Sequence, residues 1–183
     1  VSAPAARVEA RAWRLELSRP AMGTLVSVTA LGPSHQRLET AIGRAFEEMD
    51  RLVALLSRHD GASPVSHLND AGHLDGPPPE VAEVVGQALG WHRLTHGAFD
   101  PTVAPLVDLF QDRLTCATPA QPTAAEIADA RALVGARHVE MSRRRIGFAR
   151  PAMRVTLDGI AKGYIVDGIA ATLDRLGVRR YLV

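Results

Sequence analysis

The segment Val155–Asp167, with the sequence VTLDGIAKGYIVD, holds the residues whose types and spacing best suit phosphate binding. Val155 and Leu157 alternate with polar neighbours, as in a half-buried strand. Asp158 and Gly159 then form a pair that is typical of a turn. The segment predicts a strand that leads through a tight turn directly into a helix.

The helix that follows this turn would direct its N-terminus at a ligand over Gly159. Apolar residues recur at helical spacing from Ile160 onward, and Gly177 stands where a C-terminal cap is expected. The first turn would offer backbone N–H groups and the positive end of the helix dipole, and Lys162 would add a full charge. The alternative is a merely solvated lysine. The segment matches neither GxxxxGK[ST] nor GxGxxG, so it gives little support for ATP or NAD.

A second loop contains residues that could take part in ligand binding. It reads THGAFDPTVAPL and surrounds residue 100. Gly97 frees the backbone, Phe99 can pack inward, and Asp100 is held extended by the proline that follows it. The structural interpretation is that Asp100 caps a short helix over Val103–Leu109. The alternative is a ligand-binding loop.

A third loop, Ser18–Thr24, lies between two predicted strands and reads SRPAMGT. Gly23 permits an unusual backbone angle, and Met22 would be an exposed side chain at the tip. An exposed methionine is most often unremarkable. A flexible thioether can also lie against a planar aromatic ligand.

The long amphipathic helix predicted over Gln36–Ser57 ends in the polar segment RHDGASPVSHLND. Turn-forming residues dominate that segment, so we expect at most one helical turn, around Val65–Leu68. His59 and Asp60 stand at its start, where such residues usually end a helix.

The remaining elements follow from caps and periodicity. A helix should begin at Pro77–Pro79. A loop is expected over Gln111–Pro122. After it, Thr123 with Glu126 forms a capping box for a helix that ends near Gly135. Strands are expected at Arg137–Met141, Arg145–Phe148, Met153–Leu157 and Val178–Val183, with Arg143–Arg145 in a hairpin turn.

Composition excludes several classes of protein. Of 183 residues, 46% are hydrophobic and 22% are charged, which is ordinary for a globular protein. A net charge of +1 gives no electrostatic case for nucleic acid. A single cysteine, Cys116, excludes an internal disulfide, and no apolar run reaches the length of a membrane span. We expect residues 1–12, which are rich in alanine, to be a disordered or processed segment, and 13–183 to belong to a single domain.

Taken together, AMGT, RHDGASPVSHLN, THGAFDPTVAPL and VTLDGIAKGYIVD, in this order, resemble the ApbE family, the FAD:protein FMN transferases. The resemblance covers Arg14–Val183. It implies an α+β fold, related to the T-fold class, with mixed sheets and packed helices. It also implies Mg²⁺-dependent transfer of FMN from FAD, as substrate, to a threonine or serine hydroxyl of a target protein, with release of AMP.

The resemblance also implies roles for particular residues. Met22 would lie beside the flavin, and His59 takes the place of a family tyrosine against the ring system. The family's remaining cofactor-binding positions match Ala98, Phe99, Asp100, Thr156 and Lys162, and Gly159 matches a residue whose carbonyl ligates the metal.

The chain departs from the family pattern in three ways. Many members have Asp where Thr156 stands and Gly where Asp158 stands, and His59 puts a titratable ring at the flavin. The family's other metal ligands, an Asp and a Thr, and a histidine often proposed to activate the acceptor, lie in a C-terminal portion beyond Val183. We therefore expect the chain to be truncated and unable to transfer FMN at a normal rate alone, and the general base is unknown.

Two rival functions remain open at this stage: an FAD pyrophosphatase, with water as the acceptor, and an FAD-binding protein without turnover. The resemblance implies an acceptor subunit with a flavinylated Thr or Ser, with a membrane-bound redox complex as one candidate target. It also implies a location in the periplasm or at the outer face of the bacterial inner membrane. A cytoplasmic location is the alternative.

Overall fold

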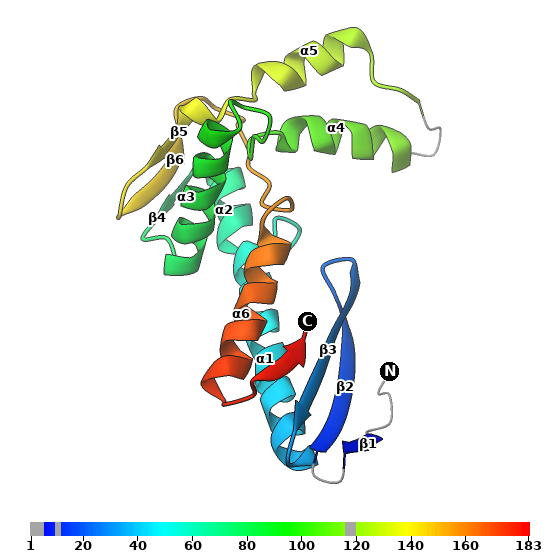
Figure 1. Cartoon of the computed structure of the whole chain (residues 1–183). Coiled ribbons are helices and arrows are strands. Elements are labelled where there is room, and N and C mark those ends of the chain that lie inside the picture. Colours follow the sequence, from blue (N-terminus) through cyan, green and yellow to red (C-terminus); the bar gives the residue numbers. More distant parts are fainter. Residues whose placement is uncertain (1–5, 10–11, 116–119) are drawn as a thin grey trace. The chain divides into compact units, whose positions relative to one another are not determined.

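The computed structural model of the chain describes residues 6–9, 12–115 and 120–183 (Figure 1). It is an α+β structure with two small antiparallel sheets. Two compact units are present within the chain. The first unit comprises Val1–Val53 and Lys162–Val183, and the second comprises Ala54–Ala161.

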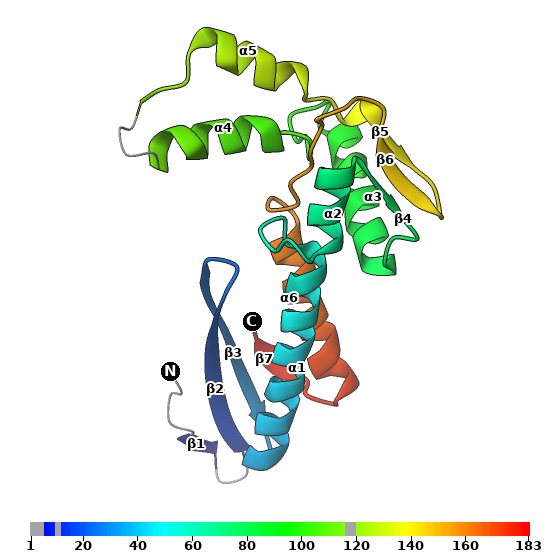
Figure 2. The ribbon, with the colours of Figure 1, turned by 180° about the vertical axis from the view of Figure 1, so that it is seen from behind.

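The first unit packs a four-stranded sheet with two helices. The sheet order is β1 (Ala6–Glu9), β2 (Ala12–Ala21), β3 (Thr24–Gly32) and β7 (Arg180–Leu182), and the helices are most of α1 (His35–Leu56) and α6 (Ala161–Arg175). Figure 2 shows α1 and α6 side by side. They approach so closely that a Cβ on Gly168 would lie 2.6 Å from Leu52 Cδ1. The strand β1 falls within residues 1–12, which we expected to be disordered or processed.

The β2–β3 hairpin is tighter than the sequence suggested. The strands continue to Ala21 and Thr24, so only Met22 and Gly23 form the turn rather than the whole of Ser18–Thr24. Both turn residues have positive φ, 53° and 71°, which matches the twist of paired strands. Met22 lies at the tip as predicted, but its side chain is partly buried.

The second unit contains four helices, a 3₁₀ turn and a three-stranded sheet. The helices are α2 (Pro64–Ala71), α3 (Pro79–Leu94), α4 (Ala104–Thr115) and α5 (Ala124–Ala132), followed by η1 (Ala136–His138). The sheet order is β4 (His73–Asp75), β6 (Arg145–Phe148) and β5 (Val139–Met141). The apolar core includes Val65, Leu68, Val84, Ile146, Met153 and Leu157.

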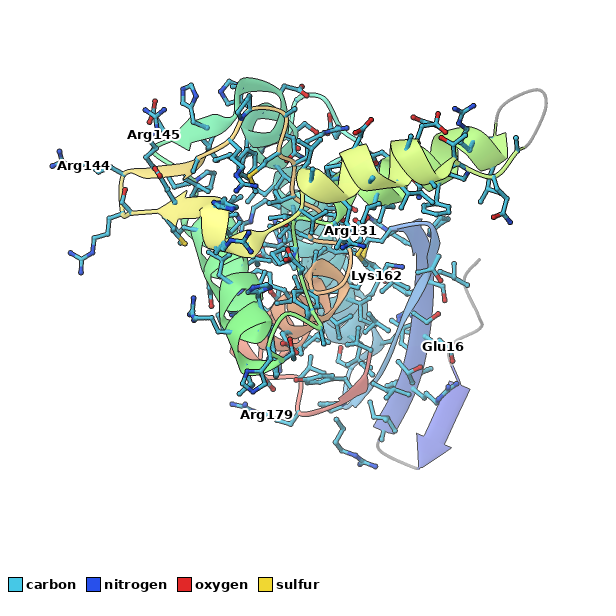
Figure 3. The ribbon with its side chains drawn as sticks, turned by 90° about the horizontal axis from the view of Figure 1, so that it is seen from above. Glu16, Arg131, Arg144, Arg145, Lys162 and Arg179 are labelled. Carbon is cyan, nitrogen blue, oxygen red and sulfur yellow. The ribbon has the colours of Figure 1, made fainter. Side chains whose placement is uncertain are left out.

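Local sequence signals located several boundaries correctly. The capping box of Thr123 and Glu126 is present at the start of α5. Gly177 has a φ of 77° after α6, and Val178 N donates to Leu173 O at 3.0 Å, as in a Schellman cap. Arg143 and Arg144 lie in the β5–β6 hairpin turn, where Figure 3 shows Arg144 extending outward, whereas Arg145 already begins β6.

Other predictions of secondary structure were wrong. Helix α4 continues to Thr115 through residues expected to form a loop, because 104–115 contains no glycine and its proline stands in the first turn. Helix α2 is eight residues long rather than one turn. The Ser63 side chain caps it and Pro64 begins it. Strand β4 was not predicted.

Candidate functional site

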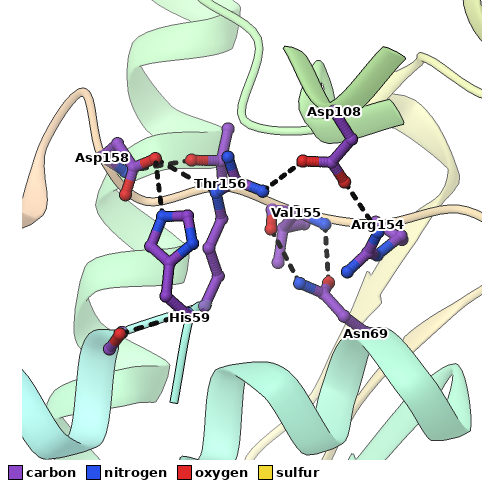
Figure 4. A network of polar contacts seen from close by, with 9 residues as sticks. His59, Asn69, Asp108, Arg154, Val155, Thr156 and Asp158 are labelled. Atoms are coloured by element: carbon purple, nitrogen blue, oxygen red, sulfur yellow. Dashed lines mark hydrogen bonds and ion pairs between the residues drawn. The ribbon is translucent and has the colours of Figure 1, made fainter. Parts of the chain in front are cut away.

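The segment Met153–Leu157 is extended but forms no strand, which corrects the sequence prediction (Figure 4). A side chain takes the place of a neighbouring strand: Asn69 Oδ1 accepts from Val155 N at 2.7 Å, and Asn69 Nδ2 donates to Val155 O at 2.9 Å. Thr156 N donates to Pro101 O at 2.8 Å. Val155 and Leu157 are each 1% exposed and Thr156 is 8% exposed, so both faces of the segment are buried rather than one.

Asn69 is a residue that the sequence analysis missed. It lies on the inner face of α2 with Val65 and Leu68, at the i, i+3, i+4 spacing of a buried helical stripe. Recognition of α2 as a full helix would have placed this amide inside the unit. A buried asparagine on such a face must find polar partners, and the backbone of Val155 supplies them.

The turn after this segment is closed by its own backbone. Thr156 Oγ1 accepts from Asp158 N at 3.2 Å, and Leu157 O accepts from both Ile160 N at 2.9 Å and Ala161 N at 2.7 Å. These two N–H groups therefore do not point outward, contrary to our expectation for the start of the helix. Asp158 and Gly159 are exposed at the outside of the turn.

Gly159 lies directly against the second loop. A Cβ at this position would be 3.0 Å from Phe99 Cε2 and 3.7 Å from Phe99 Cζ. Only a glycine allows the turn and the Phe99 ring to approach this closely. The structure thus brings together two of the loops that the sequence analysis singled out.

The Phe99–Thr102 loop is organised around the Asp100 carboxylate. Oδ1 accepts from Thr102 N at 2.8 Å and from Thr102 Oγ1 at 2.5 Å, while Oδ2 accepts from Ala136 N at 3.3 Å. His92 Nδ1 lies 3.3 Å from Oδ2 and 3.1 Å from Phe99 O. Asp100 therefore braces its own loop instead of capping α4, which begins only at Ala104.

A partly buried ion network lies beside the turn, and the sequence analysis did not find it (Figure 4). Arg58 Nε donates to Asp158 Oδ2 at 3.1 Å, and Arg58 Nη1 donates to Asp108 Oδ1 at 2.5 Å. Arg154 Nη1 donates to the other oxygen of Asp108 at 2.6 Å. The Arg58 side chain is only 3% exposed, and its Nη2 has no hydrogen-bond partner among the described residues.

The charge of Arg58 is maintained by its partners. Burial alone would lower its pKa, but hydrogen bonds to Asp108 and Asp158, with the attraction of both carboxylates, outweigh burial and raise the pKa above the ordinary value. Arg58 is therefore a fixed cation. Removal of either acidic partner would leave a buried charge partly uncompensated.

The other candidate residues of the second unit are exposed. The His59 side chain is 64% exposed, and its Nε2 lies 4.0 Å from Asp158 Oδ2. Ala98 is exposed next to the half-buried Phe99. His59, Ala98, Phe99, Asp100, Thr156 and Gly159 all belong to this unit. Met22 and the exposed Lys162, in the first turn of α6, belong to the other unit.

The described residues contain neither a membrane-spanning helix nor a cluster of side chains that could ligate a metal. None of the described helices has the length and hydrophobicity of a membrane span. Within residues 6–9, 12–115 and 120–183, no three His, Cys, Asp or Glu side chains gather as a metal site would require. The metal ligand inferred at Gly159 is a backbone carbonyl and not one of these side chains.

Comparison with known proteins identifies the family to which the chain belongs. The ApbE family matches residues 22–183, and the chain belongs to this family. An FAD:protein FMN transferase of Vibrio cholerae is 31% identical over 183 residues, which cover 96% of this chain and 53% of that protein. A protein of the same name from Klebsiella pneumoniae is 30% identical over 171 residues, which cover 88% of this chain and 48% of that protein.

Solved structures agree with this assignment. The flavin transferase ApbE from Vibrio cholerae superposes with a TM-score of 0.79 at 28% identity, covering 97% of this chain and 56% of that one. The apo form of the Pseudomonas stutzeri flavinyl transferase ApbE gives a TM-score of 0.80 at 28% identity, covering 92% and 54%. The α+β, ApbE-like fold is thereby confirmed. The chain spans about half the length of the curated relatives it matches.

Proposed function

We propose that the protein is an FAD:protein FMN transferase, which moves FMN from FAD to a threonine or serine hydroxyl of a target protein and releases AMP. Membership of the ApbE family and the names of its relatives support this function. The structural observation that carries it is the packing of Gly159 against Phe99, which joins the two most family-specific motifs.

The chain offers distinct groups for the parts of FAD. In the proposal, Met22 and His59 contact the flavin, Ala98 and Phe99 contact the cofactor through their backbone, and the Thr156 hydroxyl and Lys162 charge favour the pyrophosphate. The Asp100 carboxylate already accepts hydrogen bonds from Thr102 and Ala136, and its side chain is 12% exposed. Its contribution to FAD binding would be to hold the loop in shape.

A divalent cation, proposed to be Mg²⁺, fits the chemistry of the turn. Mg²⁺ takes oxygen ligands and often keeps several waters. The Gly159 carbonyl lies in an exposed turn and would be one such ligand, with Asp158 adjoining it. When bound, the ion would supply charge neutralisation for the pyrophosphate.

The reaction requires little covalent chemistry from the protein. The acceptor hydroxyl oxygen bonds to the FMN phosphorus, the bond to the AMP phosphate oxygen breaks, and the hydroxyl proton passes to a base that remains unassigned. The protein's task is to hold the pyrophosphate in line with the acceptor, and orientation of this kind can supply much of the rate.

The acceptor in this proposal is a flavoprotein subunit with a reactive Thr or Ser, such as a subunit of a membrane-bound redox complex. The proposed location is the periplasm or the outer face of the bacterial inner membrane. Expression of the full reading frame in a bacterial host, followed by cell fractionation, would test the location. Recovery only from the cytoplasm would contradict it.

The function is tested with protein from the full reading frame, incubated with FAD, Mg²⁺ and an acceptor domain that carries a threonine. A transferase yields acceptor that keeps flavin fluorescence after denaturation, with AMP in equal amount. An acceptor with Thr→Val at the modified position is the matched control. AMP and free FMN without a labelled acceptor would indicate a pyrophosphatase, and binding without AMP would indicate an FAD-binding protein.

A further inference from the structure

The turn that we propose to face the pyrophosphate carries a negative charge of its own. The Asp158 side chain is 57% exposed and adjoins Gly159 directly in the sequence. A carboxylate next to an anionic ligand weakens its binding, because like charges repel. Compensation of the Asp158 charge therefore favours pyrophosphate binding at this turn, in addition to the Mg²⁺ proposed at the Gly159 carbonyl.

Arg58 is placed to provide that compensation. Its Nε donates to Asp158 Oδ2 at 3.1 Å from a side chain that is 3% exposed. The guanidinium is buried whereas the carboxylate is 57% exposed, so water screens this contact less than it screens an ion pair between two exposed side chains. The pairing also restricts the carboxylate, and hence the turn, to one arrangement.

The other side of Arg58 is fixed as well. Arg58 Nη1 donates to Asp108 Oδ1 at 2.5 Å, and Arg154 Nη1 donates to Asp108 Oδ2 at 2.6 Å. Asp108 thus lies between two cations. If its carboxylate moved away, the buried Arg58 would lose one of its two acidic partners, which is unfavourable. The network ties α4 to the turn through Arg58 and to the segment before the turn through Arg154.

We infer that Arg58 is a positioning residue that neutralises Asp158 and fixes the Asp158–Gly159 turn for the pyrophosphate of FAD. The inference rests on the proposed function. Arg58 need not touch FAD; it acts through Asp158. Loss of Arg58 should therefore matter chiefly because Asp158 remains charged.

That dependence gives a sharp test, by titration of the full-length protein with FAD at a fixed magnesium concentration. Arg58→Gln should weaken FAD binding about tenfold or more, since a charged hydrogen bond is lost and a carboxylate is exposed to the ligand. Adding Asp158→Asn to Arg58→Gln should recover most of this loss. A double variant as weak as Arg58→Gln, or weaker, would overturn the inference and assign Arg58 a structural role only.

Two further variants keep the test decisive. Arg145→Gln removes an exposed arginine whose Nη1 lies 3.5 Å from Asp75 Oδ1, and it should leave FAD affinity unchanged. If Arg58→Gln does not fold, Arg58→Met removes the charge with an apolar side chain suited to a buried site; its FAD affinity should fall about tenfold, and Asp158→Asn should again restore affinity. Failure of that rescue overturns the inference. Failure of the wild type to bind FAD would instead contradict the proposed function itself.

Discussion

Asn69 and Val155, 86 residues apart, hold each other through a pair of hydrogen bonds that imitates one rung of a β-sheet. The amide on α2 donates to the carbonyl and accepts from the N–H of the segment that leads into the Thr156–Gly159 turn. A single side chain thereby fixes the register of the turn relative to α2, in a place where no strand pairs with the segment.

Asn69→Ala should destabilise the protein by about 2–4 kcal/mol, because two buried backbone groups of Val155 would lose their partners. Chemical denaturation with circular dichroism would measure the loss. Gln87→Ala, at an exposed position of α3, is the matched control and should change stability by less than about 0.5 kcal/mol. Equal stability of both variants would show that water replaces the Asn69 amide.

Gly159→Ala should weaken FAD binding while reducing stability by only about 1 kcal/mol. The new methyl group would lie 3.0 Å from Phe99 Cε2 and displace the ring, which is only half-buried. Gly61→Ala is the control, since a Cβ there meets nothing within 4 Å. FAD titration and thermal melting of both variants would separate the effects. Unchanged FAD affinity in Gly159→Ala would mean that the contact between Gly159 and Phe99 has no part in binding.

Lys162→Ala should weaken FAD binding by about 1.5–3 kcal/mol through loss of one charged contact to phosphate. Arg144→Ala removes an equal charge from the end of the β5–β6 hairpin (Figure 3) and should have no effect. Calorimetric titration with FAD would compare them. Similar losses of FAD affinity in both variants would indicate a long-range electrostatic attraction between the protein and FAD. Added salt would abolish such an attraction.

His138 should make the protein less stable in mild acid. Burial first, and then the charges of Arg150 and Arg137, lower the His138 pKa below 6.5 in the folded state. Below about pH 6.5 the unfolded chain binds a proton that the folded chain does not, so stability falls as the pH decreases toward the lower folded pKa. His138→Gln should remove this part of the slope of melting temperature against pH. His67→Gln, at an exposed position, is the control and should keep this slope of melting temperature against pH. An unaltered slope in His138→Gln would refute the role of His138.

The parts of the fold that could be predicted are those specified by residues close together in the sequence. Periodicity gave the long helix α1, and short-range caps gave α5 at Thr123 and the end of α6 at Gly177, because these signals act within one helical turn. The loops that carry the family motifs were also recognised. Each of these motifs is a continuous stretch of the sequence and contains a glycine or a proline.

The contacts that build the candidate site were not predictable in the same way. Arg58 meets Asp108 and Asp158 across 50 and 100 residues, and Asn69 meets Val155 across 86. No local pattern specifies such partners. Val155 and Leu157 alternate with polar residues as a strand would, yet Thr156 is buried too, because the Pro101 carbonyl and the Asn69 amide satisfy the backbone there.

A crystal structure of the full-length protein soaked or grown with FAD and Mg²⁺ would test the proposed site most directly. We predict that the pyrophosphate lies over the Asp158–Gly159 turn, within hydrogen-bond distance of Thr156 Oγ1 or Lys162 Nζ, with the Arg58–Asp158 contact intact and the flavin against Met22 and His59. A pyrophosphate bound away from this turn, with Lys162 and Thr156 remote from the ligand, would contradict both the site and the role assigned to Arg58.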